Sequence, residues 1–364
     1  MNGRTGSDSA FQFEGTWKEF APIAFTNLLL TVVTLGIYRF WATTRERQYL
    51  WSRSRFVDET LEWAGTGKEL FIGFLLVAIL FLLPFFVISQ VSQALILRGQ
   101  ETLGVMLTLL SFLMIFYLAG VARFRALRYR LSRTRWRGIR GGSDAQGFRF
   151  GLSYMWKNFI GYIALGLLIP WSMVSLWNER WSKMSFGPHR FEATAEQGPV
   201  FIRFLLFYLA PVILFFAVFI GGLLAAGLGL SGGFDTIDPN NIGATFVLVT
   251  FLFIFGFYFV LGLIAVSFYA AFYREVVGAT RWDSVGFSFT ASTREWVMLL
   301  LGDAVLVVFT LGVGYIFLSY RHWKFFITHL EADGEIRLDE LTQSTTDTSR
   351  HGEGLLDAFD MGAI

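Results

Sequence analysis

Four stretches of this chain are long, apolar and free of charged side chains, and they constrain its fold more than any other feature. They lie at about 70–90, 103–121, 204–228 and 244–270. Each provides the roughly 20 apolar residues that a helix needs to cross a hydrocarbon core of about 30 Å. They predict four transmembrane helices. With 54% hydrophobic and 16% charged residues, the composition also argues against a soluble chain.

Three further apolar segments, at about 20–38, 157–177 and 296–319, are interrupted by polar residues and glycines. Basic residues concentrate on the cytoplasmic side of membrane proteins. If only the four uninterrupted segments cross, Arg98 is the one basic residue among 30 Lys and Arg that lies outside. This asymmetry favours four spans with three re-entrant or interfacial helical hairpins. Both termini are then cytoplasmic in a multi-pass protein of the bacterial inner membrane.

Pairs of similar residues recur along the chain and predict a threefold internal repeat. Trp41 matches Trp171 at an offset of 130 residues (171 minus 41). The run 34–36 (Thr-Leu-Gly) recurs at 310–312, an offset of 276 (310 minus 34). The repeats are expected at about 11–90, 148–228 and 287–334, within one membrane domain that covers residues 1–330. Residues 335–364 form an acidic tail that is expected to be mostly disordered.

Short runs with period-two alternation suggest strands between the helices. These runs lie at 11–13, 60–63, 148–150, 189–192 and 287–289. We expect them to form short cytoplasmic β-hairpins, which could join in one small sheet. The predicted fold class is therefore an all-α polytopic membrane protein with four transmembrane helices, three hairpins and minor β-structure.

The chain resembles the YjgN-like family of bacterial inner-membrane proteins of unknown function. The resemblance rests on Asn27, the run 34–42, Phe71-x-Gly73 and the tail motif at 352–360. Family members usually carry proline where this chain has Phe40, which concerns only the local turn. The resemblance implies an inner-membrane location and no particular activity.

Two polar residues inside apolar segments are candidate functional groups. Asp303 is a carboxylate deep in the segment 296–319, and Asn27 is its equivalent in the first repeat. Intramembrane carboxylates often bind protons or cations. Because Asn and Asp share the ability to cap a helix N-terminus, a cap on a half-helix is the favoured interpretation.

Three groups of residues complete the candidate list. The carboxylates Glu62, Glu192 and Glu331 occupy matching places and could converge on a cation, although ion pairs with nearby arginines are the favoured interpretation.

The arginine run after the second predicted span indicates contact with anionic lipid headgroups. Its candidate members are Arg123, Arg125, Arg128, Arg130, Arg133 and Arg135. The apolar residues at the end of the tail are candidate partner-docking residues, or lie back on the basic layer. They are Leu355, Leu356, Phe359 and Met361.

The sequence carries no motif for nucleophilic catalysis, metal binding or nucleotide binding, so we expect neither an enzyme nor a cofactor. Membrane lipids are the expected partners, with a protein partner possible through the tail and no nucleic acid. The favoured function is a non-enzymatic accessory, scaffold or lipid-interacting protein. The alternative is a transporter or channel with a site at the broken helices near Asn27 and Asp303, since such helices often mark a binding site at the bilayer midplane.

Overall fold

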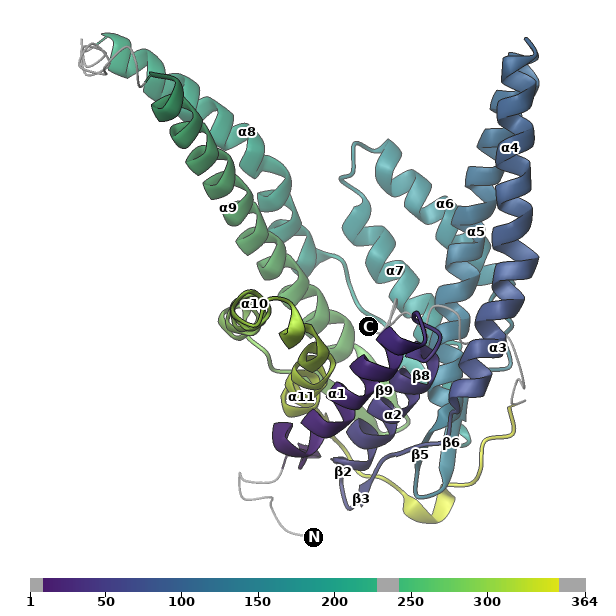
Figure 1. Cartoon of the computed structure of the whole chain (residues 1–364). Coiled ribbons are helices and arrows are strands. Elements are labelled where there is room, and N and C mark those ends of the chain that lie inside the picture. The colour runs from purple at the N-terminus through teal and green to yellow at the C-terminus, as the bar shows by residue number, and fades with distance from the viewer. Residues whose placement is uncertain (1–8, 228–241, 347–364) are drawn as a thin grey trace.

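The computed structural model describes residues 9–227 and 242–346. Helical arms extend from one side of a curled sheet and diverge as they leave it (Figure 1). The helices are α1 (Trp17–Val33), α2 (Arg39–Ser52), α3 (Gly67–Val77), α4 (Leu83–Leu97), α5 (Glu101–Arg133), α6 (Phe148–Ile163), α7 (Ile169–Trp181), α8 (Gly198–Gly227), α9 (Ile242–Gly278), α10 (Thr293–Phe309) and α11 (Leu318–His329). Shorter helical turns lie at η1 (Ala78–Leu82), η3 (Val313–Phe317) and η4 (Leu338–Glu340).

Three helices of the described chain, not four, are long and apolar enough to cross a membrane. They are α5, the part of α8 from Gly198 to Phe216, and the part of α9 from Ile254 to Gly278. The remaining predicted span, at 70–90, is divided into α3, the π-helical turn η1 and the apolar helix α4. Pro84 gives the reason, because a proline has no N–H to donate and clashes with the carbonyl four residues earlier. That carbonyl lies inside η1, where the regular α-helical bonding is interrupted.

The expectation of an all-α fold is wrong, because the base of the molecule is a sheet of eight strands. All neighbouring strands are antiparallel, in the order β11-β10-β9-β8-β7-β6-β5-β4, and the sheet curls into a half-barrel. The eight strands are β4 (Glu62–Trp63), β5 (Thr134–Trp136), β6 (Ile139–Gly142), β7 (Ser185–Phe186), β8 (His189–Ala193), β9 (Thr280–Trp282), β10 (Val285–Phe289) and β11 (Leu330–Asp333). A second sheet contains β1 (Phe11–Phe13), β2 (Ser54–Phe56) and β3 (Glu59–Thr60).

Four of the five alternating runs lie in strands, as predicted. Residues 11–13, 60–63, 189–192 and 287–289 are in or span strands, whereas 148–150 begins helix α6. Gly147 adopts φ +85° immediately before α6, and this left-handed residue turns the chain into the helix. Phe150 then packs against Phe124 of α5, with 5.6 Å between the ring centroids. Burial of one helical face, rather than period-two alternation, decides the conformation there.

The three interrupted segments form helical hairpins with the same turn. In each hairpin a leucine and the following glycine both have positive φ. The pairs are Leu35 (+51°) and Gly36 (+91°), Leu165 (+53°) and Gly166 (+83°), and Leu311 (+50°) and Gly312 (+92°). The hairpins are α1–α2, α6–α7 and α10–η3–α11. A left-handed conformation costs a non-glycine residue about 1–2 kcal/mol, and each of the three hairpins carries this strain at its leucine.

Indole hydrogen bonds attach the second helix of each hairpin to a strand. Trp51 of α2 donates to Thr134 Oγ1 of β5 at 2.9 Å, and Trp177 of α7 donates to Thr280 Oγ1 of β9 at 3.3 Å. Trp323 of α11 donates to Ser54 Oγ of β2 at 2.8 Å. The last bond joins the third hairpin to the first part of the chain, so the three hairpins surround a common centre.

Two tryptophans of the eight-stranded sheet are buried and link neighbouring hairpins. Trp136 is 1% exposed and donates its indole N–H to Phe56 O at 3.0 Å. Trp282 is 4% exposed and makes the corresponding bond to Phe186 O at 3.1 Å. A buried indole N–H needs an acceptor. Here the acceptor is a carbonyl of the neighbouring β-hairpin, so each bond links two hairpins.

The described part of the tail, residues 335–346, packs against the sheet instead of being disordered. Ser284 Oγ of the β9–β10 turn donates to Glu335 O at 2.5 Å. Gln343 donates to Gly138 O at 2.9 Å, and its Oε1 accepts the Arg140 backbone N–H at 3.1 Å. The tail is thus ordered from 335 as far as 346, and its remaining residues lie outside the described part of the chain. There the side chain of Gln343 forms its hydrogen bonds with the backbone of the β5–β6 hairpin.

Candidate functional site

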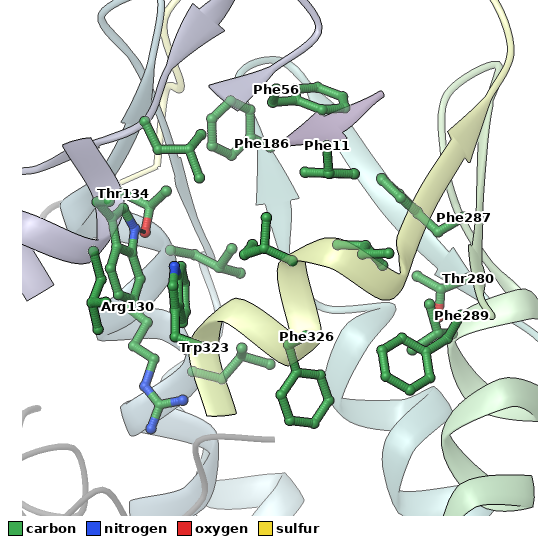
Figure 2. A pocket seen from close by; sticks show the side chains of 18 of the residues that line it. Phe11, Phe56, Arg130, Thr134, Phe186, Thr280, Phe287, Phe289, Trp323 and Phe326 are labelled. Atoms are coloured by element: carbon green, nitrogen blue, oxygen red, sulfur yellow. Dashed lines mark hydrogen bonds between the residues drawn. The ribbon is translucent and has the colours of Figure 1, made fainter. Parts of the chain in front are cut away.

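A cavity of about 690 Å³ lies where the three hairpins meet the curled sheet. One helix of every hairpin lines it (α2, α7 and α11), together with the bases of α5 and α9 and residues of several strands. Figure 2 shows phenylalanines 11, 56, 186, 287 and 289 from the strands, and Trp323 and Phe326 from α11, around the space. Pockets of about 300–1,000 Å³ with a mostly apolar lining and a few polar groups are typical ligand sites.

The charged groups of the cavity are few and mainly cationic. The charged or titratable side chains of its lining are Glu46, Arg47, Arg130, Arg180, Tyr273 and His322. Arg47 is 5% exposed and lies 4.9 Å from the centroid of the Trp63 ring, and Arg180 is 8% exposed and lies 5.5 Å from that of Trp177. Stacking on indole rings favours a guanidinium in an apolar setting.

The structure places Asp303 in the middle of α10, where it caps no helix. Its carboxylate is 2.5 Å from Arg321 Nε and 2.6 Å from His322 Nε2, both on α11. The cap of α10 is Ser292, whose hydroxyl accepts the Glu295 backbone N–H in a capping box. Asp303 thus joins the two helices of its hairpin, and the cap interpretation is wrong.

Asn27 lies at the corresponding place in the first hairpin and has the same role. It is 3% exposed, and its Nδ2 donates to Ala42 O at 3.2 Å and to Glu46 Oε1 at 3.4 Å, both on α2. The second hairpin has Lys157 there (27 plus 130), 9% exposed and 2.7 Å from Glu179 of α7. Sequence reasoning missed Lys157, although the repeat offset points to it.

The three candidate carboxylates do not converge. Glu62 in β4 stands opposite Arg135 of β5, and Glu192 in β8 stands opposite Arg281 of β9. Glu331 is in β11, at the end of the eight-stranded sheet opposite β4. They lie on three separate strands, so a shared cation site is wrong. Glu62 and Glu192 thus each have an arginine as cross-strand neighbour, whereas Glu331 stands opposite Ser288.

Most arginines of the predicted headgroup-binding run bind within the protein. Arg123 bonds to Tyr154 Oη at 2.5 Å, Arg125 to Gln146 O at 3.1 Å, and Arg128 to Ala145 O at 3.2 Å. Arg133 is 3.0 Å from Glu69, and Arg135 lies in strand β5.

Arg130 differs from the rest of the run because it lines the cavity (Figure 2). Sequence reasoning did not identify the cavity or Arg180. The available signal was an arginine, Arg180, between the aromatic residues Trp177 and Trp181. The docking residues Leu355, Leu356, Phe359 and Met361 lie outside the described residues.

Comparisons with known proteins show a family and a location. A family model described as "Bacterial protein of unknown function (DUF898)" matches residues 8–358. The chain is 32% identical over 104 residues to the Inner membrane protein YjgN of Salmonella typhimurium, a match that covers 29% of this chain and 24% of that relative. It is 28% identical over 131 residues to YjgN of Escherichia coli K12, which covers 36% of this chain and 30% of the relative. The matched stretches thus span under a third of these relatives. No solved structure matches. Together with the three apolar helices, the relatives' names support an inner-membrane location.

Proposed function

This chain belongs to the bacterial family of unknown function DUF898, and we propose that it is a non-enzymatic lipid-binding protein of the inner membrane. The observation that carries the proposal is the cavity of about 690 Å³ at the base of the apolar helices. The lower ends of α5 and α9 line the cavity, and both helices continue as apolar arms. A lipid could therefore reach the cavity from the bilayer along them. Its aromatic and aliphatic lining suits an acyl chain.

The hairpin tips support insertion of this region into the membrane. Leu35 and Leu311 are each 94% exposed and Leu165 is 75% exposed, all at the turn of a hairpin. Exposed apolar side chains in such positions are favourable when lipid covers them. We therefore propose that the hairpins enter one leaflet without crossing, as interfacial or re-entrant elements of a threefold repeat. The shared left-handed turn of the three hairpins supports the repeat.

The charge distribution supports an orientation with the sheet in the cytoplasm. The sheet and the basic end of α5 carry many arginines, whereas the turn between α4 and α5 carries only Arg98. The positive-inside rule then puts the sheet and both termini in the cytoplasm. In this arrangement α5, α8 and α9 cross the bilayer. The interrupted segment α3–η1–α4 runs beside α5 as the further crossing that two cytoplasmic termini require.

The transporter alternative receives less support from the geometry. Its expected site was near Asn27 and Asp303, and both side chains bind to the second helix of their own hairpin. A polar pathway would require such groups to face a continuous water-filled space. The cavity is instead lined mostly by aromatic and aliphatic residues.

A cavity-filling substitution tests lipid binding directly. Thr43 lines the cavity from α2, so Thr43→Phe adds a ring to that space. We expect the purified Thr43→Phe protein to retain fewer lipids than wild type, counted by native mass spectrometry after gentle delipidation. The matched control is Thr60→Phe, because Thr60 is exposed on β3. Equal lipid retention by wild type, Thr43→Phe and Thr60→Phe would refute the proposal.

A further inference from the structure

Two neighbouring N–H donors at the end of α7 lie buried against the cavity with no acceptor in the described part of the chain. Arg180 is 8% exposed, and its Nε has no hydrogen-bond partner there. The indole Nε1 of Trp181 is likewise buried without an acceptor among the described residues. Both residues line the cavity. Buried donors are nearly always satisfied in native proteins, so these two need an acceptor that occupies the cavity.

The surroundings of Arg180 favour a negatively charged acceptor. Burial and the nearby cations Arg130 and Arg123 lower the pKa of Arg180 to about 10, with Tyr273 acting in the opposite direction, so its guanidinium remains cationic at neutral pH. A buried cation requires a compensating anion or strong hydrogen bonds. The charged side chains that act on Arg180 are cations like itself, which strengthens the need for an anion.

The acidic lining residue of the cavity is already engaged. Glu46 accepts from Asn27 Nδ2 at 3.4 Å and from Ser319 Oγ at 3.1 Å. The Glu46 carboxylate thus bonds to the first and third hairpins. Within the cavity, an anion for Arg180 of α7 would have to come from a ligand. A guanidinium fork and an adjacent indole N–H match the oxygens of a carboxylate or a phosphate.

We infer that the cavity binds an anionic amphiphile, with its oxyanion head at Arg180 and Trp181 and its apolar tail among the aromatic side chains. This inference rests on the proposed lipid-binding function and specifies its ligand class. The head requires an oxyanion, which a fatty acid provides as carboxylate and a phospholipid as phosphate. The tail needs only an apolar space that excludes water.

The test uses amphiphiles with one tail and different heads. Delipidated full-length protein in an uncharged detergent is titrated with palmitate, hexadecyl phosphate, hexadecanol and hexadecyltrimethylammonium, and the bound fraction is measured by native mass spectrometry. We expect both anions to bind at least about tenfold more tightly than hexadecanol, because hydrogen bonds to charged groups are the strong ones. The cation is expected to bind least. Comparison of palmitate with hexadecyl phosphate distinguishes a fatty acid from a phosphate-headed lipid.

Substitutions then assign the head site. Arg180→Gln should lose about tenfold in affinity for the anions while hexadecanol binding stays unchanged, and Arg180→Lys should restore most of the loss. Trp181→Phe removes only the indole donor and should weaken anion binding by a smaller factor. The matched control is Arg190→Gln, since the Arg190 side chain is 72% exposed on β8.

The outcomes separate this inference from the function on which it rests. If hexadecanol binds as tightly as the anions and Arg180→Gln changes nothing, the anion site is refuted and lipid binding stands. If none of the four amphiphiles binds, the lipid-binding function fails as well. If Arg180→Gln is misfolded, Trp181→Phe and the preference of the wild-type protein among the four heads still decide the question.

Discussion

Neutralising Asp303 should destabilise the protein by removing the link between the two helices of the third hairpin. Asp303 is 7% exposed, and its carboxylate accepts hydrogen bonds from Arg321 and His322. Hydrogen bonds to charged groups contribute about 1.5–3 kcal/mol each when buried. The side chains of Arg321 and His322 are 34% and 42% exposed, so water compensates part of the loss. We therefore expect Asp303→Asn to lower the free energy of unfolding by about 1–2 kcal/mol.

The assay is unfolding of the purified protein in mixed detergent micelles, followed by tryptophan fluorescence. Arg321→Gln and the double variant complete a double-mutant cycle, which should give a coupling energy of about 1 kcal/mol. Asp339→Asn is the matched control, because Asp339 is exposed in η4. Wild-type stability of Asp303→Asn, or additive effects in the double variant, would refute the link.

Three further outcomes test the fold and its orientation. Trp136→Phe removes the indole donor to the carbonyl of β2 and should cost about 1 kcal/mol in the free energy of unfolding; an unchanged midpoint would contradict that role. The Ser292 hydroxyl and N–H donate to Glu295 and hold the pKa of its carboxyl below the usual value. This stabilisation is complete above the unfolded pKa of about 4.3 and is lost as the pH falls through the folded pKa, so the stability difference between wild type and Ser292→Ala should shrink below about pH 4. Because the chain contains no cysteine, Gln100→Cys should react with a membrane-impermeant maleimide in intact spheroplasts, and Glu59→Cys only after lysis. The reverse pattern would invert the proposed orientation.

The sequence alone determined the elements whose signal is local. Apolar length predicts α5, α8 and α9, because an uninterrupted apolar helix is stable in lipid whatever its neighbours are. The run Thr-Leu-Gly at 34–36 and 310–312 was recognisable as a repeat, and the structure shows that it forms the turn of two hairpins. Alternation located five of the eleven described strands (β1, β3, β4, β8 and β10). The apolar segments with polar interruptions singled out Asn27 and Asp303, which are buried.

Only the tertiary structure decided what those buried groups do and where the site lies. The role of Asp303 depends on α11 returning along α10, and local sequence equally allowed a cap. The eight-stranded sheet consists of strands of two to five residues from distant parts of the chain, and their pairing depends on non-local hydrogen bonds that no short window records. The cavity likewise arises from three hairpins and a curled sheet. Arg180 acquires its significance only because that assembly buries it without an acceptor from the described chain.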